Sequence, residues 1–253
     1  MVDFISINGA QLAYRLTGPQ NAPLIITLHG GRGFGSFFSP RPRFSNTNGI
    51  LGDHKSDFAA FSPLSDRYRV LSFDYRGHGQ SSRTKPYSFQ QIVDDIEALR
   101  VHHVGPERQC IICGGSFGGF LAQQYAIQYA DKVSHLILRG TAPSHHREGS
   151  LLGAKASLWY ADVSSADEDK AIQTLETRLH RSPGLSVSML KEKIFGQFQN
   201  DDEFRLVMLC AAPLYAEKFD PDGALRKNLE TVFDAESHSK QTSARFSGRV
   251  DVW

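Results

Sequence analysis

The sequence predicts an α/β fold, in which a mostly parallel β-sheet carries helices on both faces and a helical cap is inserted after its parallel strands. Over positions 1–143, continuous apolar runs alternate with apolar stripes at helical spacing. Over positions 144–236 the strand patterns stop and only helical patterns remain. A chain of 253 residues is long enough for one large domain with an insertion. We therefore expect a core at 1–143, a helical cap at 144–236 and an atypical tail at 237–253.

The chain opens with a predicted antiparallel hairpin. Two segments, Phe4–Ile7 and Gln11–Leu16, alternate apolar and polar residues. Asn8-Gly9 separates them, and this dipeptide favours the type I′ turn that joins two strands tightly.

Four apolar runs follow and are predicted to be parallel strands buried on both faces: Leu24–Leu28, Tyr68–Phe73, Cys110–Cys113 and Leu136–Leu138. A helix is predicted between the second and third runs, with Ser88 as its N-cap. Another begins at Phe117 and ends near Asp131. Because strands alternate with helices, the sheet should be covered on both faces.

Two stretches depart from this alternation. The segment Gly35–Asp53 is rich in Ser, Pro and Asn without periodicity and is predicted to be an exposed loop. The predicted cap contains helices at Lys155–Ala161, Asp167–Leu179, Val187–Phe198, Phe204–Ala212 and Gly223–Phe233. Such a block would cover the mouth of the sheet, where open α/β sheets bind ligands.

Composition excludes several classes of function. Lys and Arg (28) nearly balance Asp and Glu (27), and no block of like charge predicts nucleic acid or an anionic membrane as a partner. No apolar stretch has membrane-spanning length, and the N-terminus lacks a signal-peptide pattern. Three cysteines give no disulfide framework, so we expect a cytoplasmic protein. Cys110 and Cys113 form a C-x-x-C pair, but on a strand they should face opposite sides, which favours packed thiols over a redox pair.

Gly114–Gly119 is the most informative motif. Its sequence, Gly-Gly-Ser-Phe-Gly-Gly, lies between a predicted strand and a predicted helix, with Ser116 at the apex. This is the pattern of a nucleophile elbow, which lifts a serine toward a base and toward N–H donors. The alternative is a merely flexible glycine-rich turn.

Two further motifs follow other strands. His29-Gly30-Gly31-Arg32-Gly33 can turn backbone N–H groups toward the site, so we expect an oxyanion hole from the N–H groups of Gly31 and Phe117. Each donor would stabilise the transition state by roughly 3 to 4 kcal/mol. A phosphate cradle is the alternative, but the Lys-Ser/Thr of a P-loop is missing, and we predict no cofactor and no metal. The third motif is Asp74–Ser81, of the form Asp-x-Arg-Gly-x-Gly-x-Ser.

In this order the three motifs resemble those of α/β-hydrolases of the proline iminopeptidase type, and the match extends over about Phe4–Phe233. The resemblance implies that Ser116 is the nucleophile, that Gly31 and Phe117 are oxyanion donors, and that an N-terminal residue, often proline, is released from small peptides or amides. It also implies that cap carboxylates hold the substrate's α-amino group. The carboxylates available here, whose alternative is a solvated helix face, are Asp201, Asp202, Glu203 and Glu217.

The sequence departs from the family's pattern in three places. Arg32 stands where the family has proline, and positions 36–52 resemble an insertion. In this superfamily the triad acid and base follow the serine. The resemblance places them after two further strands, roughly 60 residues that would fall beyond Trp253. We therefore expect the last two strands to be missing from this chain, which would leave one sheet edge unpaired.

Substitute bases within the chain can be considered. After Ser116 they are His135, His145, His146, His180 and His238. His135 is expected to be structural, and Asp234 with His238 has the right order but lies too close in sequence to come from two strand ends. Before Ser116, His78 could touch the pocket, and His29 is expected to fix its own turn. None of them restores an obvious triad.

The leading hypothesis is therefore a serine hydrolase that acts on a small peptide, amide or ester through an acyl-enzyme on Ser116. One alternative is a truncated, catalytically impaired relative or a small-molecule binding module, and another is an esterase or lactonase, since the fold does not fix the substrate. Serine rather than aspartate at the elbow disfavours dehalogenase and epoxide hydrolase chemistry. The sequence leaves the oligomeric state open.

Overall fold

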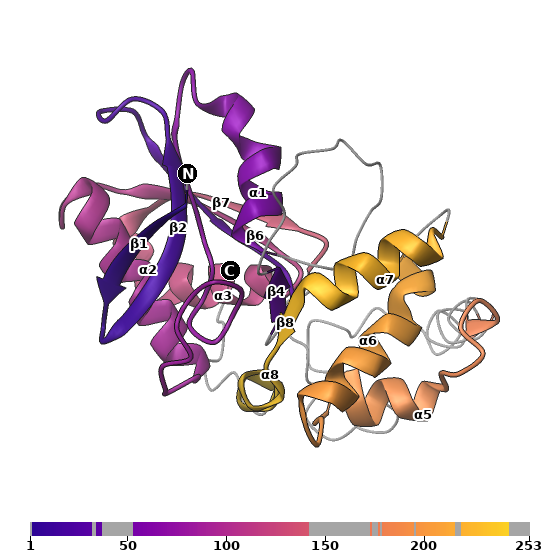
Figure 1. The fold of residues 1–253 in the computed structure, drawn as a ribbon. Coiled ribbons are helices and arrows are strands. Elements are labelled where there is room, and N and C mark those ends of the chain that lie inside the picture. Colours follow the sequence, from indigo (N-terminus) through magenta and orange to yellow (C-terminus); the bar gives the residue numbers. More distant parts are fainter. Residues whose placement is uncertain are drawn as a thin grey trace.

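The computed structural model describes residues 2–31, 34–36, 53–141, 173, 177, 179–194, 196–215 and 219–242. Six strands form the main sheet in the order β1–β2–β5–β3–β6–β7 (Figure 1). Their bounds are β1 Asp3–Ile7, β2 Ala10–Thr17, β3 Leu24–Leu28, β5 Arg69–Phe73, β6 Cys110–Gly115 and β7 Val133–Arg139. β1, β2 and β5 are antiparallel neighbours, whereas β5, β3, β6 and β7 run parallel. The predicted mostly parallel sheet is confirmed.

The N-terminal hairpin forms at the predicted turn. Asn8 and Gly9 both have positive φ, 46° and 77°, as a type I′ turn requires. Ile7 therefore pairs with Ala10, and the apolar faces of both strands turn toward the core.

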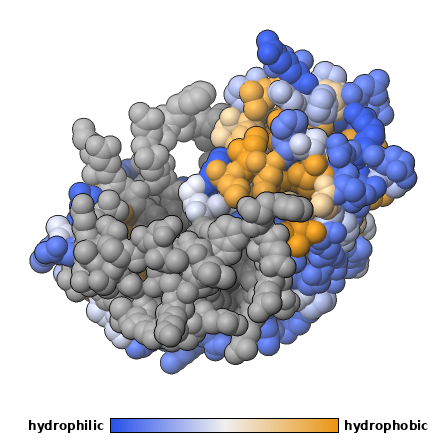
Figure 2. Space-filling view, turned by 180° about the vertical axis from the view of Figure 1, so that it is seen from behind, coloured by the Kyte–Doolittle hydropathy of each residue, from blue (hydrophilic) through white to orange (hydrophobic). Residues whose placement is uncertain are grey.

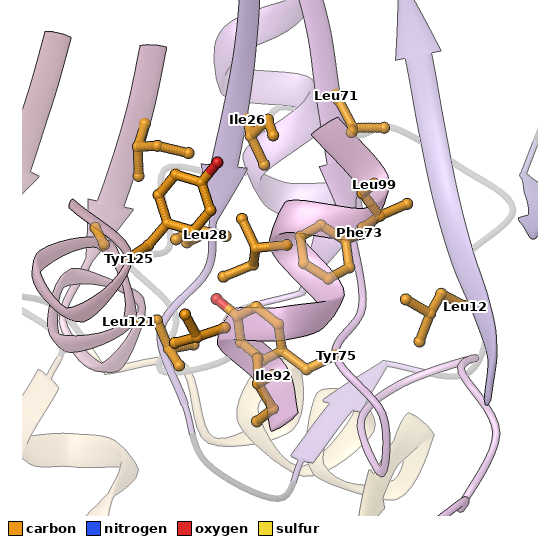
Figure 3. Packing of buried hydrophobic residues seen from close by; sticks show 14 of the residues in the cluster. Leu12, Ile26, Leu28, Leu71, Phe73, Tyr75, Ile92, Leu99, Leu121 and Tyr125 are labelled. Carbon is orange, nitrogen blue, oxygen red and sulfur yellow. The ribbon is translucent and has the colours of Figure 1, made fainter. Parts of the chain in front are cut away.

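Helices cover both faces of the sheet. α2 (Phe89–Val104) and α3 (Phe117–Gln128) pack on one face, and Figure 3 shows side chains from both helices meeting those of the central strands. α1 (His54–Phe61) packs on the other face, where Phe61 contacts a smaller apolar cluster. Cys110 lies in the large apolar cluster under α2 and α3, whereas Cys113 lies in the smaller cluster that Phe61 contacts. The two thiols therefore face opposite sides of the sheet, as predicted. Burial raises the pKa of Cys110 to about 12.

The C-terminal part of the described chain is mostly helical. Its elements are α5 Val187–Met189, the π-helical turn η4 Leu190–Ile194, α6 Asp201–Tyr215, α7 Pro221–Glu230 and α8 Ala235–Thr242. Two short 3₁₀ helices, η1 Ser62–Leu64 and η2 Ala130–Lys132, belong to the N-terminal part that contains the main sheet. A separate apolar cluster holds the helical part together, with Phe204 at its centre between Phe198 and Phe233. The predicted helix at Lys155–Ala161 and most of the one at Asp167–Leu179 fall outside the described residues.

A small second sheet corrects two predictions. β4 (Phe34–Ser36) pairs antiparallel with β8 (Thr231–Phe233), so Phe34 lies opposite Phe233. The sequence predicted a loop from Gly35 onward and a helix as far as Phe233, and both predictions were wrong at these positions. Such short strands leave no periodic pattern, and their pairing joins a segment near the start of the chain to one near its end.

β7 corrects a third prediction. Its apolar run was predicted to be buried on both faces, but Leu136, Ile137 and Leu138 are 40%, 45% and 44% exposed. β7 is one of the two edge strands of the described sheet and, among the described strands, pairs with β6 alone. Viewed from behind, the molecule shows an apolar area on the side where β7 lies (Figure 2). A fully apolar run looks the same whether its strand is central or at an edge.

Candidate active site

Ser116 lies at the sharp junction between β6 and α3. Its φ of 50° and ψ of −117° make it one of two non-glycine residues with positive φ in the described chain. Such a conformation costs an L-residue about 1 to 3 kcal/mol and persists only where neighbours hold it. The Ser116 N–H donates to the Arg139 carbonyl over 3.0 Å, and the Thr141 hydroxyl donates to the Ser116 carbonyl over 2.9 Å.

Glycines let the elbow close. A β-carbon on Gly118 would overlap the Leu28 carbonyl oxygen, and one on Gly114 would overlap the Gly118 carbonyl oxygen. The first turn of α3 therefore lies directly against the ends of β3 and β6, a distance that only glycine allows.

The turn after β3 lies directly beside Ser116. A β-carbon on Gly30 would lie 3.2 Å from Ser116 Cβ and 3.7 Å from Ser116 Oγ. The Tyr75 hydroxyl donates to the His29 carbonyl over 2.8 Å, which fixes the start of this turn. Phe117 is the first residue of α3, so its N–H has no acceptor within the helix. Gly31, with φ of 80°, belongs to the same turn.

A buried carboxylate and imidazole lie behind this turn. Asp74 Oδ2 is 2.8 Å from His54 Nδ1, and Asp74 also accepts the backbone N–H groups of His54 and Gln80, each over 2.9 Å. His29 Nε2 is 3.8 Å from Asp74 Oδ1. Burial alone would raise the pKa of Asp74, but the hydrogen bond and charge of His54, with help from His29, hold that pKa below its usual value. His54 was not predicted from the sequence, because its partner Asp74 lies on a different element and only the fold brings the two side chains together.

His78 contacts the turn after β3. Its Nδ1 lies 3.1 Å from the Arg76 carbonyl, it hydrogen-bonds the backbone of Gly31, and its ring lies parallel to that of Phe117 with centroids 6.5 Å apart. Burial, together with the neighbouring His29, lowers the pKa of His78 to about 3. His78 is therefore neutral at physiological pH and acts as a fixed hydrogen-bonding group beside the turn.

The remaining candidate bases lie elsewhere. His135 is exposed on β7, His180 is exposed in a turn, and His145 and His146 fall outside the described residues. His238 is buried between Phe198 and Phe204 with its Nε2 3.2 Å from the Ile194 carbonyl. The rings of His29, His54, His78 and His238 contact other groups, and no hydrogen bond joins Ser116 Oγ to a histidine within the described residues.

Asp234 and His238 belong to the start of α8. Asp234 accepts the N–H of Ser237 over 2.8 Å, so its carboxylate caps the helix, and burial raises its pKa. The two residues are one helical turn apart, and the His238 ring is turned into the apolar cluster of the helical part.

The predicted cap carboxylates that the structure describes have different contacts. Glu203 lies 2.8 Å from Lys193 Nζ and also accepts the Gln199 N–H. Asp201 accepts the Ala235 N–H over 2.8 Å. Asp202 lines a pocket of about 430 Å³ together with Asp201, Glu230 and two arginines, Arg83 and Arg205. Glu217 falls outside the described residues.

Neither a metal site nor a membrane segment was found in the described ranges. No group of three or more His, Cys, Asp or Glu side chains there could hold a metal ion. None of the helices described has the length and apolar character that crossing a bilayer would require.

Known proteins share this fold and part of this sequence. Residues 42–203, well over half of the chain, match the alpha/beta hydrolase fold family. Proline iminopeptidase PfmaB of Pestalotiopsis fici is 57% identical over 239 residues, which are 94% of this chain and 72% of that protein. The chain belongs to the proline iminopeptidase type of α/β-hydrolase.

Two further comparisons set the limits of this similarity. A proline iminopeptidase of Arabidopsis thaliana is 34% identical to this α/β-hydrolase over 132 residues, 51% of the chain and 29% of the plant protein. The crystal structure of a hydrolase from Pseudomonas aeruginosa covers 96% of the chain with a TM-score of 0.55 at 20% identity, and 71% of that structure is matched. At that identity the structural match supports the fold alone. The resemblance predicted from the three motifs is confirmed.

Proposed function

We propose that this α/β-hydrolase is a serine hydrolase that releases an N-terminal residue, preferentially proline, from small peptides or amides. The observation that carries the proposal is the placement of Ser116 at a positive-φ apex, beside the turn after β3 and at the N-terminus of α3. A serine held in this way presents its hydroxyl at the carboxyl edge of a parallel sheet, where open α/β sheets bind ligands.

The proposed chemistry passes through an acyl-enzyme. Ser116 Oγ attacks the carbonyl carbon of the N-terminal residue, and its proton passes to the leaving amine as the C–N bond breaks. This transfer needs a general base, a role that none of the described histidines fills by a hydrogen bond to Ser116 Oγ. Water then attacks the ester, and the free N-terminal residue leaves. While negative charge is on the carbonyl oxygen, the N–H groups of Gly31 and Phe117 would donate to it, each contributing roughly 3 to 4 kcal/mol. The positive end of the α3 dipole adds to this stabilisation.

The substrate preference rests on similarity to relatives named as proline iminopeptidases. Such a substrate carries a free α-amino group, and carboxylates are the side chains that pair with it. Asp201 and Asp202 line the pocket beside α6 and β8 and are our candidates for this role. All three cysteines are free thiols, which supports a reducing, cytoplasmic environment.

Turnover of an N-terminal proline amide tests the proposal. The wild-type chain should hydrolyse the amide, and Ser116→Ala should abolish turnover without lowering the unfolding temperature. Hydrolysis of esters or lactones but not of the amide would favour the esterase alternative. Binding of the amide without any turnover would favour the binding-module alternative.

A further inference from the structure

We propose that Thr141 is a positioning residue that orients the peptide group whose N–H, that of Phe117, serves as an oxyanion donor. This inference rests on the proposed role of Ser116. Thr141 follows the end of β7 and donates its hydroxyl to the Ser116 carbonyl oxygen over 2.9 Å. The Ser116 carbonyl and the Phe117 N–H belong to one planar peptide group, so fixing the carbonyl also fixes the direction of the N–H.

The peptide group on the other side of Ser116 is held from the same strand. The Ser116 N–H donates to the Arg139 carbonyl over 3.0 Å. Residues 139–141 therefore hold both peptide groups that flank Ser116. This matters because Ser116 has φ of 50° and ψ of −117°, a conformation it would leave if its peptide groups were free to rotate.

Two glycines make room for Thr141. A β-carbon on Gly119 would lie 2.5 Å from Thr141 Cβ and Oγ1, so only glycine lets the threonine come this close. Gly140, with φ of 50°, turns the chain between Arg139 and Thr141. The approach of Thr141 to the elbow thus has its own conformational requirements, separate from the hydrogen bond.

The end of β7 is itself anchored. The Arg139 guanidinium lies 3.2 Å from Asp57 on α1, and its Cζ is 4.8 Å from the ring centroid of Phe61. A β-carbon on Gly115 would come within 3.0 Å of the same guanidinium. Thr141 therefore extends from a fixed point, and its hydroxyl can hold the Ser116 carbonyl against rotation.

The hydroxyl also has an electronic effect. The Ser116 carbonyl accepts from Thr141 and also from the Gly119 N–H over 2.9 Å. A carbonyl that accepts hydrogen bonds polarises its peptide group, which makes the N–H a better donor. Loss of the Thr141 hydroxyl should weaken binding of the transition state more than binding of the ground state.

Three variants test this role. Thr141→Val keeps the shape but removes the donor, Thr141→Ala removes the donor and a methyl group, and Thr141→Ser keeps the donor. Ser134→Ala is the matched control, because Ser134 donates to the Cys110 carbonyl over 3.1 Å at the opposite end of β7. We would measure kcat and KM for an N-terminal proline amide, the rate of Ser116 labelling by a fluorophosphonate, and the unfolding temperature.

Both donor-free variants should lose about tenfold in kcat and in labelling rate, while KM stays within about twofold, as expected for a misdirected oxyanion donor. Thr141→Ser and Ser134→Ala should retain nearly wild-type kcat. Wild-type kcat in Thr141→Val, or an equal loss in Thr141→Ser, would overturn the positioning role while leaving the proposed function intact. A wild-type chain inert toward both amide and probe would overturn the proposed function and the positioning role with it.

Discussion

Gly30 lies against Ser116, so closely that a β-carbon on Gly30 would come 3.2 Å from Ser116 Cβ. The turn after β3 and the elbow after β6 therefore lie in close contact, and a methyl group on Gly30 would fit only if one of them shifted slightly. Gly30→Ala should push the two apart by a few tenths of an ångström and lower the rate of Ser116 labelling at least tenfold. A wild-type labelling rate in Gly30→Ala would show that this turn contributes nothing to the reactivity of Ser116.

Gly118 should be needed for folding of the elbow itself. A methyl group there would meet the Leu28 carbonyl oxygen, and backbone cannot move aside as a flexible side chain can. We expect Gly118→Ala to lower the free energy of unfolding by about 1 to 3 kcal/mol, measured by urea denaturation. Gly184→Ala is the control, since nothing lies within 4 Å of the added methyl. Equal effects of the two substitutions would refute the close packing of α3 on β3.

His78 should make stability depend on pH. Burial lowers its pKa to about 3, whereas in the unfolded chain it is about 6.5. Between these two pKa values the unfolded chain binds a proton on His78 that the folded chain does not bind. The contribution of neutral His78 to the free energy of unfolding is therefore fully present above pH 6.5 and is lost as the pH falls toward 3. His78→Gln should give a flatter dependence of unfolding free energy on pH between 6.5 and 4.

The control for this measurement is His135→Gln, which removes an exposed histidine of β7 that does not contribute to the lowered pKa of His78 or His103. His103, whose pKa burial lowers to about 4, contributes to the same pH window and remains in all three proteins. An unchanged slope in His78→Gln would mean that His78 takes up its proton in the folded state as readily as in the unfolded chain.

The arginine of the Asp-x-Arg-Gly-x-Gly-x-Ser motif has a structural role. Arg76 pairs with Asp95 on α2 through two hydrogen bonds of 2.6 and 2.7 Å, and both side chains are buried. Removing one partner leaves the other charge buried and unpaired, so Asp95→Ala should cost about 3 to 5 kcal/mol of unfolding free energy. Asp94→Ala, which changes the neighbouring carboxylate with its mostly exposed hydrogen bonds, should cost far less. Similar losses in the two variants would contradict this role of Arg76.

Local patterns predicted the features that depend on neighbours in sequence. The hairpin at Asn8-Gly9, the strand before Ser116 and the N-cap at Ser88 were all predicted, because each depends on residues within a few positions. The elbow was predicted for the same reason. Its glycines, its serine and its preceding strand are contiguous in the sequence.

The features that the sequence did not predict depend on residues far apart in the chain. β4, near the start of the chain, pairs with β8, near its end, and His54 meets Asp74 only once α1 packs on the sheet. The hydrogen bond from Thr141 to the Ser116 carbonyl likewise joins the ends of two strands, and neither residue type predicts this contact. The exposure of β7 escaped prediction because its sequence carries no polar alternation, although its place at the edge of the sheet leaves its apolar side chains uncovered.

The central claim is that Ser116 is a reactive nucleophile, and the most direct measurement is labelling of the intact chain by a fluorophosphonate with the modified residue located by mass spectrometry. We predict one adduct, on Ser116, and none in Ser116→Ala. An unmodified Ser116 in the folded wild-type protein, under conditions that label a known serine hydrolase, would contradict the claim.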